Sequence, residues 1–306
     1  MSAASSEGRE PHAQDAAWTH APERGSMALI RLMAWLSLRI GRAPARLLLP
    51  AITAYYFASA GAARRAAREY LEHCLGRAPT LAERYRLFHS FASTLHDRVF
   101  FLAGRFELFD VAVHGAEVLG PGGAILMGAH LGSFEAIRAC ARGPAQRPVA
   151  MAMYEANARR VRTLATALDP TLEHDIVALG RVGSMLELRE RLEGGAMVGV
   201  LADRTLGAEP VVEVSFLGAP APFPTGPMRM AAALRQPVYF MAALYRGANR
   251  YEVHFEPLAD FSDMDAPGRS ERAARVQAAV VRYAERLEHY CRIAPDNFFN
   301  FHRFWR

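Results

Sequence analysis

The sequence predicts an α/β fold, in which a mostly parallel sheet is flanked by helices and preceded by an N-terminal helical segment. Three observations predict it. The 306-residue chain is 51% hydrophobic, which is enough to bury a large core. After Phe106, short apolar runs alternate with segments of helical periodicity, as in a parallel sheet with crossover helices. Before Phe106, apolar residues recur at helical spacing.

These differences divide the chain into three regions. Residues 1–25 are small, polar and mixed in charge, so we expect them to be disordered. Residues 26–105 form a helical region, which we expect to associate with a membrane, and residues 106–306 form the α/β domain. The first region lacks the basic start and apolar centre of a secretory signal peptide. The chain is therefore expected to begin in the cytoplasm.

The apolar runs after Phe106 predict the strands. They lie at residues 109–113, 124–127, 148–153, 175–179, 196–201, 211–216, 238–244 and 251–255. Helices are expected at residues 134–142, 182–193, 228–234 and 269–293. In the earlier region, Pro79 separates two helices. The last ten residues mix aromatic side chains with Arg303 and Arg306, a composition that fits either an interface or packing onto the core.

Residues 27–63 are the most apolar part of the chain. Arginines interrupt their first half, and Pro44 and Pro50 break the pattern. No window therefore reaches the roughly 18–20 clean apolar residues of a spanning helix. We expect helices that lie on a membrane surface, with an apolar face inserted and arginines near the headgroups. A buried pair of core helices is the alternative.

The charged residues exclude several classes of enzyme. All 36 basic residues are arginine, and the formal net charge is +5. Without lysine the chain has neither a Walker A phosphate loop nor a Schiff-base or pyridoxal-phosphate site, because each needs that residue. Arginine binds phosphate and carboxylate with two N–H groups, so an anionic partner or membrane surface fits the charge. A codon bias would also explain the arginine usage.

The three cysteines are Cys74, Cys140 and Cys291. They are widely spaced, without a Cys-x-x-Cys pair, so the sequence indicates neither a disulfide framework nor a thiolate zinc site. A reducing, cytoplasmic environment is the simpler interpretation.

The first candidate site follows the apolar run at residues 124–127. The chain there reads Gly128-Ala129-His130-Leu131-Gly132-Ser133-Phe134-Glu135. Ligands of open α/β sheets collect beyond the carboxyl ends of strands, so this turn is a place to expect chemistry. Gly132 permits a tight turn and Ser133 can cap the helix that follows. Both are candidate substrate-binding residues.

His130 and Glu135 are the candidate catalytic residues. On one continuous helix their spacing would set them roughly 140° apart, and the turn at Gly132 removes that obstacle. If Glu135 accepts the Nδ1 proton of His130, Nε2 is free to take a proton from a hydroxyl that attacks a carbonyl carbon. Backbone N–H groups at the helix start could stabilise the oxyanion. The spacing alone is a weak signal, so a purely structural pair is the alternative.

The second candidate site follows the run at residues 196–201, where Asp203 and Arg204 stand. A crevice tolerates such ionisable residues better than a sheet interior does, although a structural ion pair at the strand end is the alternative. Next comes an apolar, proline-rich loop at residues 216–227. It would suit the wall of an apolar chain, with Phe223, Thr225 and Gly226 as candidate binding residues. An ordinary crossover is the other interpretation.

In this order, the segments resemble the lysophospholipid acyltransferase superfamily, in its bacterial lipid A (lauroyl or myristoyl) acyltransferase branch. The resemblance runs from about Trp18 to the C-terminus. Its strongest marks are the box from His130 to Glu135 and the strand-end Asp203, and its weaker marks are Phe216-Leu217-Gly218 and Phe301-His302-Arg303. Two departures concern the substrates. Arg204 stands where the branch usually has Gln, and Met153-Tyr154-Glu155-Ala156-Asn157 stands in place of an Arg-Pro-x-x-Asn-like segment.

The resemblance implies that His130 is a general base and Glu135 its orienting partner. It implies an acyl-carrier-protein or coenzyme A thioester as donor, a lipid or glycolipid as acceptor, and a peripheral or N-terminally anchored place on the cytoplasmic face of the bacterial inner membrane. Neither a cofactor, a metal nor a nucleic acid is expected. A hydrolase with the same dyad and a non-catalytic lipid-binding protein are the alternatives. The chain lacks the Gly-x-Ser-x-Gly elbow of common serine hydrolases.

Overall fold

A seven-stranded sheet lies at the centre of the computed structural model, which describes residues 27–140, 147–154, 176–181, 183–205, 209–264 and 268–305. The strand order is β1-β9-β8-β2-β5-β3-β4. The strands are β1 (Asp110–His114), β2 (Ala124–Gly128), β3 (Val149–Tyr154), β4 (Ile176–Leu179), β5 (Met197–Leu201), β8 (Pro237–Tyr245) and β9 (Arg250–Asp260). Every neighbouring pair is parallel except β8 and β9. The predicted mostly parallel sheet is confirmed.

The central strands are buried because helices cover both faces of the sheet. All residues of β2 are buried, and so are all but the last of β5. Such continuous apolar runs are typical of parallel strands covered on both sides. The edge strand β1, which pairs with β9 alone, is mostly exposed. Seven of the eight expected strands enter this sheet, and the other one is β6.

The proline-rich segment after β6 corrects one expectation. Instead of a loop, it contains β7 (Ala219–Pro224), which pairs antiparallel with β6 (Val211–Phe216) in a separate two-stranded sheet. Its prolines occupy alternate positions, 220, 222 and 224, so their nitrogens, which carry no hydrogen, all face the open edge. The intervening residues can then form the ladder with β6.

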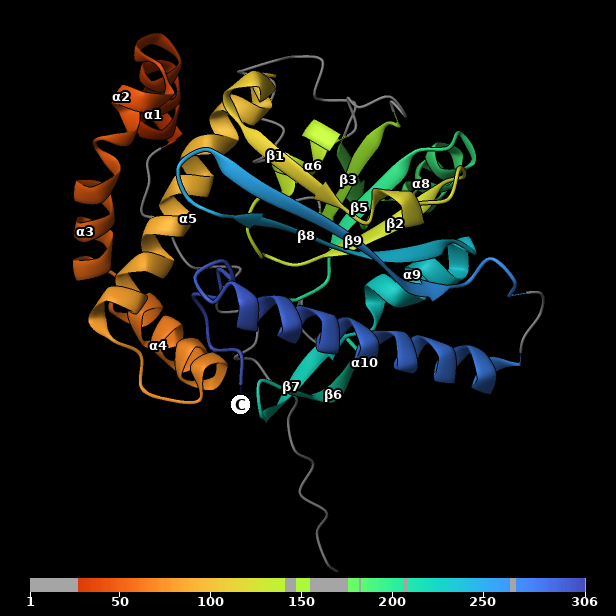
Figure 1. Ribbon diagram of the computed structural model, residues 1–306. Helices are drawn as coiled ribbons and strands as arrows, with labels where there is room; N and C mark the ends of the chain where they lie inside the picture. The colour runs from red at the N-terminus through yellow and green to blue at the C-terminus, as the bar shows by residue number, and fades with distance from the viewer. Residues whose placement is uncertain are drawn as a thin grey trace, which may run out of the picture.

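The N-terminal region is helical, as expected. Its helices are α1 (Met27–Ile40), α2 (Arg42–Arg46), α3 (Leu49–Ser59), α4 (Gly61–Leu75) and α5 (Leu81–Leu102). Thr80 and Glu83 form a capping box that begins α5 just after Pro79. Helix α5 contacts α3 and α1 on one side and α6 on the other, and it thus joins the outer helices to the sheet domain (Figure 1). In the described part of the chain, no helix is both long and apolar enough to cross a membrane.

The remaining helices cover the sheet. They are α6 (Phe134–Cys140), α8 (Ser184–Glu193), α9 (Gly226–Leu234) and α10 (Arg269–Ile293), with two short 3-10 turns at Phe106–Leu108 and Ala116–Val118. Helix α10 runs below the sheet beside α9 and the β6–β7 hairpin (Figure 1). The C-terminal segment packs inward rather than forming an exposed aromatic surface, since Phe298, Phe299, Phe304 and Trp305 are all buried.

Candidate active site

The two candidate sites of the sequence meet at one edge of the sheet. Strands β2 and β5 are parallel neighbours, with Gly128 opposite Leu201. The residues that follow these strands therefore emerge side by side, His130 from β2 and Asp203 from β5. This juxtaposition follows from the strand order, in which β5 lies next to β2 although almost seventy residues separate them.

Asp203 holds the ring of His130. The Nδ1 atom of His130 lies 2.9 Å from Oδ1 and 3.0 Å from Oδ2 of Asp203. The backbone N–H of His130 also donates to Oδ1, at 3.2 Å. The side chain of Asp203 is 1% exposed and that of His130 is 35% exposed. The ring edge with Nδ1 is therefore inside, and the opposite edge, with Nε2, is toward the surface.

The electrostatic environment keeps His130 neutral and Asp203 charged. Burial lowers the pKa of His130 below its ordinary value of 6.5, and the positive charges of Arg204 and Arg98 lower it further against the opposing effect of Asp203. Burial would raise the pKa of Asp203, but His130 and Arg204 outweigh this and lower it to about 2. At neutral pH the pair is thus an imidazole beside a carboxylate, which is the state that a general base needs.

Glu135 occupies a different place from the one expected. It lies in the first turn of α6, where its Oε1 is 2.7 Å from Nε of Arg98, and the Ser133 hydroxyl donates to its other oxygen at 3.4 Å. The side chain of Glu135 is 2% exposed. The Nδ1 contact that we expected Glu135 to make is made by Asp203 instead, because β5 brings that carboxylate against the ring while α5 brings Arg98 to Glu135.

Gly132 forms the turn that the sequence predicted. It has φ +69°, and an added Cβ would overlap the carbonyl oxygen of Ala243 in the neighbouring β8. Only glycine fits such a backbone approach without displacing the strand.

The turn leaves few backbone donors for a substrate. The N–H groups of His130, Leu131, Gly132 and Ser133 donate to Asp203, Ala129, Asn297 and Ala243, respectively. The expectation that N–H groups at this helix start stabilise an oxyanion is therefore not met by these four residues. Another donor has to serve that purpose.

The C-terminal segment forms one wall of the site. Phe299 N–H donates to the carbonyl oxygen of His130 at 2.8 Å, and Arg204 donates to the carbonyl oxygen of Phe299 at 3.2 Å. The side-chain amide of Asn297 accepts from the backbone N–H of Tyr245 and donates to its carbonyl oxygen, at the end of β8. The backbone carbonyl oxygen of Asn297 accepts from the N–H of Gly132. These bonds hold the turn from His130 to Ser133 between β8 and the end of the chain.

Comparison with known proteins identifies the family of the chain. The family model of bacterial lipid A biosynthesis acyltransferases matches residues 19–306, which is nearly the whole chain. The chain belongs to this family. Membership supports a lipid acyltransferase function, with an acyl donor and a lipid acceptor as substrates. No curated protein matches the chain.

Three residues near the site were not predicted from the sequence. Arg98 and Asn297 carry no local signal, because a helix and a C-terminal segment bring them to the site from far away in the chain. His302 stands in one of the weaker family marks. Burial, Arg204 and His130 lower its pKa to about 4, so it is neutral at pH 7.

The other candidate residues of this acyltransferase lie at the β6–β7 hairpin. Phe223 is fully buried and packs against Phe216, Tyr283 and Phe304. The Thr225 hydroxyl donates to the carbonyl oxygen of Pro210, and Gly226 is the first residue of α9. Their contact with a substrate remains a prediction.

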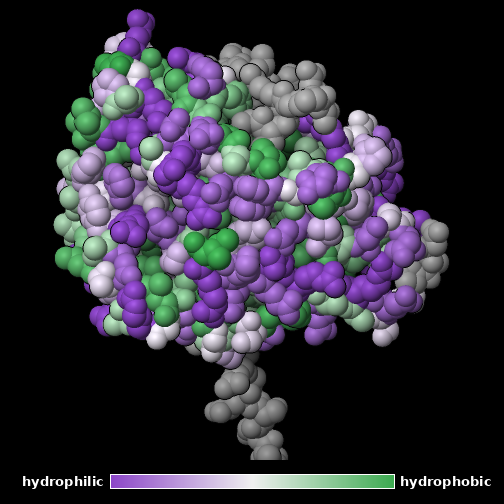
Figure 2. Space-filling view, in the orientation of Figure 1, coloured by the Kyte–Doolittle hydropathy of each residue, from purple (hydrophilic) through white to green (hydrophobic). Residues whose placement is uncertain are grey.

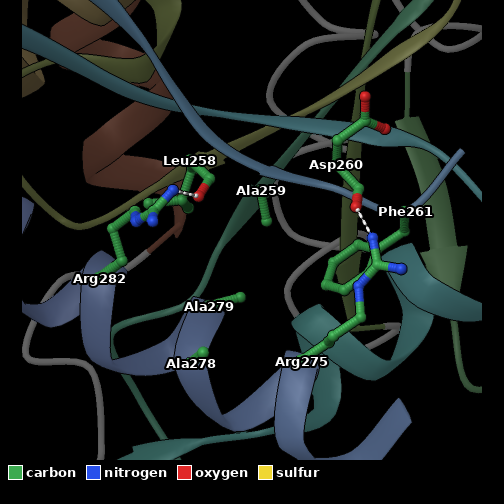
Figure 3. A pocket seen from close by; sticks show the side chains of 8 residues that line it. All are labelled: Leu258, Ala259, Asp260, Phe261, Arg275, Ala278, Ala279 and Arg282. Atoms are coloured by element: carbon green, nitrogen blue, oxygen red, sulfur yellow. Dashed lines mark hydrogen bonds between the residues drawn. The ribbon is translucent and has the colours of Figure 1, made fainter. Parts of the chain in front are cut away.

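A hollow of about 210 Å³ lies elsewhere on the surface, between β9 and α10 (Figure 3). It is lined mainly by apolar groups, and its Arg275 and Arg282 donate to backbone carbonyls of β9. Asp260 in its wall pairs with the first residue of β8, whereas the catalytic turn contacts β8 near its other end. The hollow is therefore at the opposite edge of the sheet. Within the described residues there is no cluster of three or more potential metal ligands.

Proposed function

We propose that this acyltransferase moves a fatty acyl group from an acyl-carrier-protein or coenzyme A thioester to a hydroxyl of a lipid or glycolipid, with His130 as the general base. The observation that carries the proposal is the contact of His130 Nδ1 with Asp203, which turns Nε2 toward the surface. The lowered pKa of His130 supports it, because a neutral imidazole accepts protons at physiological pH.

The proposed reaction is a simple acyl transfer. His130 Nε2 takes the proton of the acceptor hydroxyl while the hydroxyl oxygen forms a bond to the thioester carbonyl carbon. The carbonyl electrons move to oxygen and give a tetrahedral oxyanion. The oxyanion then collapses, the C–S bond breaks, and the thiolate leaves and receives the proton from the imidazolium. An ester and a thiol result, so protons and electrons balance without a cofactor.

In this proposal the two carboxylates have separate roles. Asp203 holds the ring and stabilises the imidazolium that forms during the reaction, which is the part that the resemblance assigned to Glu135. Glu135 instead neutralises Arg98. Arg204, whose side chain is 23% exposed, faces the same site and suits a phosphate group of the donor or acceptor.

We further propose that the protein binds the cytoplasmic face of the bacterial inner membrane through α1–α3. Helix α3 has no charged residue, and most of its positions are exposed. Large apolar side chains in and between these helices also face solvent, with Leu47, between α2 and α3, 80% exposed and Tyr55, in α3, 67% exposed. Figure 2 shows hydrophobic residues along the side of the molecule that these helices form. An acceptor with acyl chains stays in the bilayer, so a membrane-bound enzyme can reach it.

The test follows thiol release and lipid mass together. Purified protein is mixed with an acyl thioester, with and without lipid acceptor, and free thiol is measured alongside mass spectrometry of the lipid. Transfer requires both substrates and adds one acyl group to the acceptor. Thiol release without acceptor would instead indicate a hydrolase, and the absence of thiol release with both substrates would indicate a lipid-binding protein.

A further inference from the structure

We infer that Arg98, a residue of helix α5 held by Glu135, is the donor that stabilises the oxyanion beside His130. This inference rests on the proposed acyl transfer, because that reaction places negative charge on the thioester carbonyl oxygen. It assigns a catalytic residue from outside the two strand-end motifs. It also gives the acid of the His-x4-acid box a purpose other than orienting the histidine.

The backbone N–H groups of the turn that carries His130 are already occupied. The four successive N–H groups from His130 to Ser133 are bound to protein oxygens. Acyl transfer usually relies on donors aimed at the carbonyl oxygen as it becomes negative. Within the turn from His130 to Ser133, that donor has to be a side chain.

Arg98 lies next to the start of α6. Its Nε lies 2.7 Å from Glu135, which follows the turn directly in the first turn of α6. Its guanidinium is close enough to His130 to lower the pKa of the imidazole. The side chain is 36% exposed, whereas Glu135 is almost fully buried. Arg98 therefore lies next to Glu135, just after the turn that carries His130, and part of its side chain is open to a substrate.

The guanidinium of Arg98 has N–H groups that a substrate can use. An arginine has five N–H donors in a planar fork. Nε of Arg98 faces Glu135 as an ion pair at 2.7 Å, but its N–H makes no hydrogen bond. The four N–H groups on its two Nη atoms make no hydrogen bond to the part of the chain that the structure describes. The ion pair with Glu135 holds the guanidinium next to the turn and leaves the Nη groups for a substrate oxygen, as an oxyanion donor requires.

Arg204 is the other cation next to His130, and the structure gives it a different task. It donates to the carbonyl oxygen of Phe299 and lies 3.9 Å from Asp203. Its charge helps to lower the pKa of Asp203. Arg204 thus supports the carboxylate that orients His130, while Arg98 is paired with an acid that does not contact the ring.

The experiment compares variants of Arg98 with a double variant. Arg98→Met alone leaves Glu135 as a buried, unpaired carboxylate, which by itself destabilises the fold. The double variant Arg98→Met with Glu135→Gln removes both charges at once. Arg86→Ala, at an exposed position of the same helix, is the matched control. Circular dichroism and thermal unfolding measure the fold, and thiol release with acceptor measures kcat and KM.

We expect Arg98→Met and the double variant to lose about 10²–10³-fold in kcat with little change in KM, as when an oxyanion donor is removed elsewhere. The double variant should unfold at nearly the wild-type temperature. Added guanidinium ion should restore part of the activity of Arg98→Ala and none of His130→Ala.

Two results would overturn the inference. One is wild-type kcat in Arg98→Met, and the other is wild-type kcat in the double variant, which would mean that Arg98 only neutralises Glu135. In either case the active wild-type protein would leave the proposed function intact. A wild-type protein that transfers no acyl group would instead overturn the proposed function.

Discussion

Asp203 binds His130 twice through one oxygen, since Oδ1 accepts from the backbone N–H at 3.2 Å and lies 2.9 Å from Nδ1 of the ring. This double contact fixes both the position and the tautomer of the histidine, because Nδ1 must carry a proton to donate to a carboxylate. Asp203 is buried, and its pKa, lowered to about 2, keeps it ionised at neutral pH.

His130→Ala should abolish acyl transfer while the protein stays folded. A general base supplies roughly 10²–10⁴-fold in rate, and the loss of this partly exposed ring removes little buried apolar area. Thiol release measures the rate, and His289→Ala, on the exposed side of α10, is the control. A folded His130→Ala protein with full activity would show that the base is another residue.

Asp203→Asn and Glu135→Gln should differ in the pH dependence of kcat/KM. The pKa of His130 lies below 6.5, so wild-type activity should be full above pH 6.5 and should fall as the pH drops through the pKa of His130. Asp203 raises the pKa of His130, so Asp203→Asn should move this acid limb to lower pH and reduce kcat by up to about 10⁴-fold.

Glu135 is not among the groups that set the pKa of His130. Glu135→Gln should therefore reduce the rate without moving the acid limb. If Glu135→Gln moves it and Asp203→Asn does not, the roles that we propose for the two carboxylates are reversed.

Asp97→Asn should destabilise the docking of α2 on the rest of the protein. Asp97 is fully buried, and it accepts from Arg42 at 2.8 and 2.9 Å, from Arg46 at 3.3 Å and from the Tyr251 hydroxyl at 2.8 Å. Removal of one partner of a buried ion pair costs about 3–5 kcal/mol. Urea unfolding at pH 7 measures the loss, with the exposed Asp110→Asn as control.

The stability that Asp97 contributes should decrease at low pH. His96, Arg42 and Arg46 oppose the effect of burial and hold the pKa of Asp97 below its ordinary 3.8. The stabilisation is therefore fully present above pH 3.8 and is lost as the pH falls through the lower folded-state pKa. The difference in free energy of unfolding between wild type and Asp97→Asn should become smaller as the pH falls over this range. A constant difference would mean that the charge of Asp97 is not what stabilises α2.

Gly132→Ala should destabilise the protein far more than Gly76→Ala. Both glycines have positive φ, so each alanine is strained by about 1 kcal/mol or more. Only at Gly132 does the added Cβ overlap the backbone of β8, since the space around Gly76 is open. Thermal unfolding measures both variants. Equal shifts would indicate that the turn can move away from β8.

Leu47→Ser combined with Tyr55→Ser should weaken binding to vesicles. These two side chains are among the most exposed apolar ones between Met27 and Ser59, so they contribute little to the core and should contribute to insertion into lipid. Co-sedimentation with anionic vesicles at low salt measures binding, and Leu186→Ser, at an exposed position of α8, is the control. Unchanged binding would place the membrane contact on another surface.

Local patterns in the sequence were enough to predict most of the elements. The eight apolar runs became strands and the long C-terminal helix began at Arg269 as expected, because short buried strands and amphipathic helices have distinct periods. Gly132 was also predicted from its place in a turn. The β7 strand was missed, because its alternate prolines resemble a loop in composition and are tolerated only at an edge that pairs on one side.

The sequence by itself determined that His130 and Asp203 each end a strand of an α/β sheet and that Glu135 begins the helix after the turn. Only the tertiary structure decided which carboxylate contacts the ring. The order of the strands puts β5 beside β2, and the packing of α5 on α6 gives Glu135 to Arg98. Spacing along the chain limits which residues can be close, but the pairing of charged groups across distant elements depends on the burial and packing of the whole core.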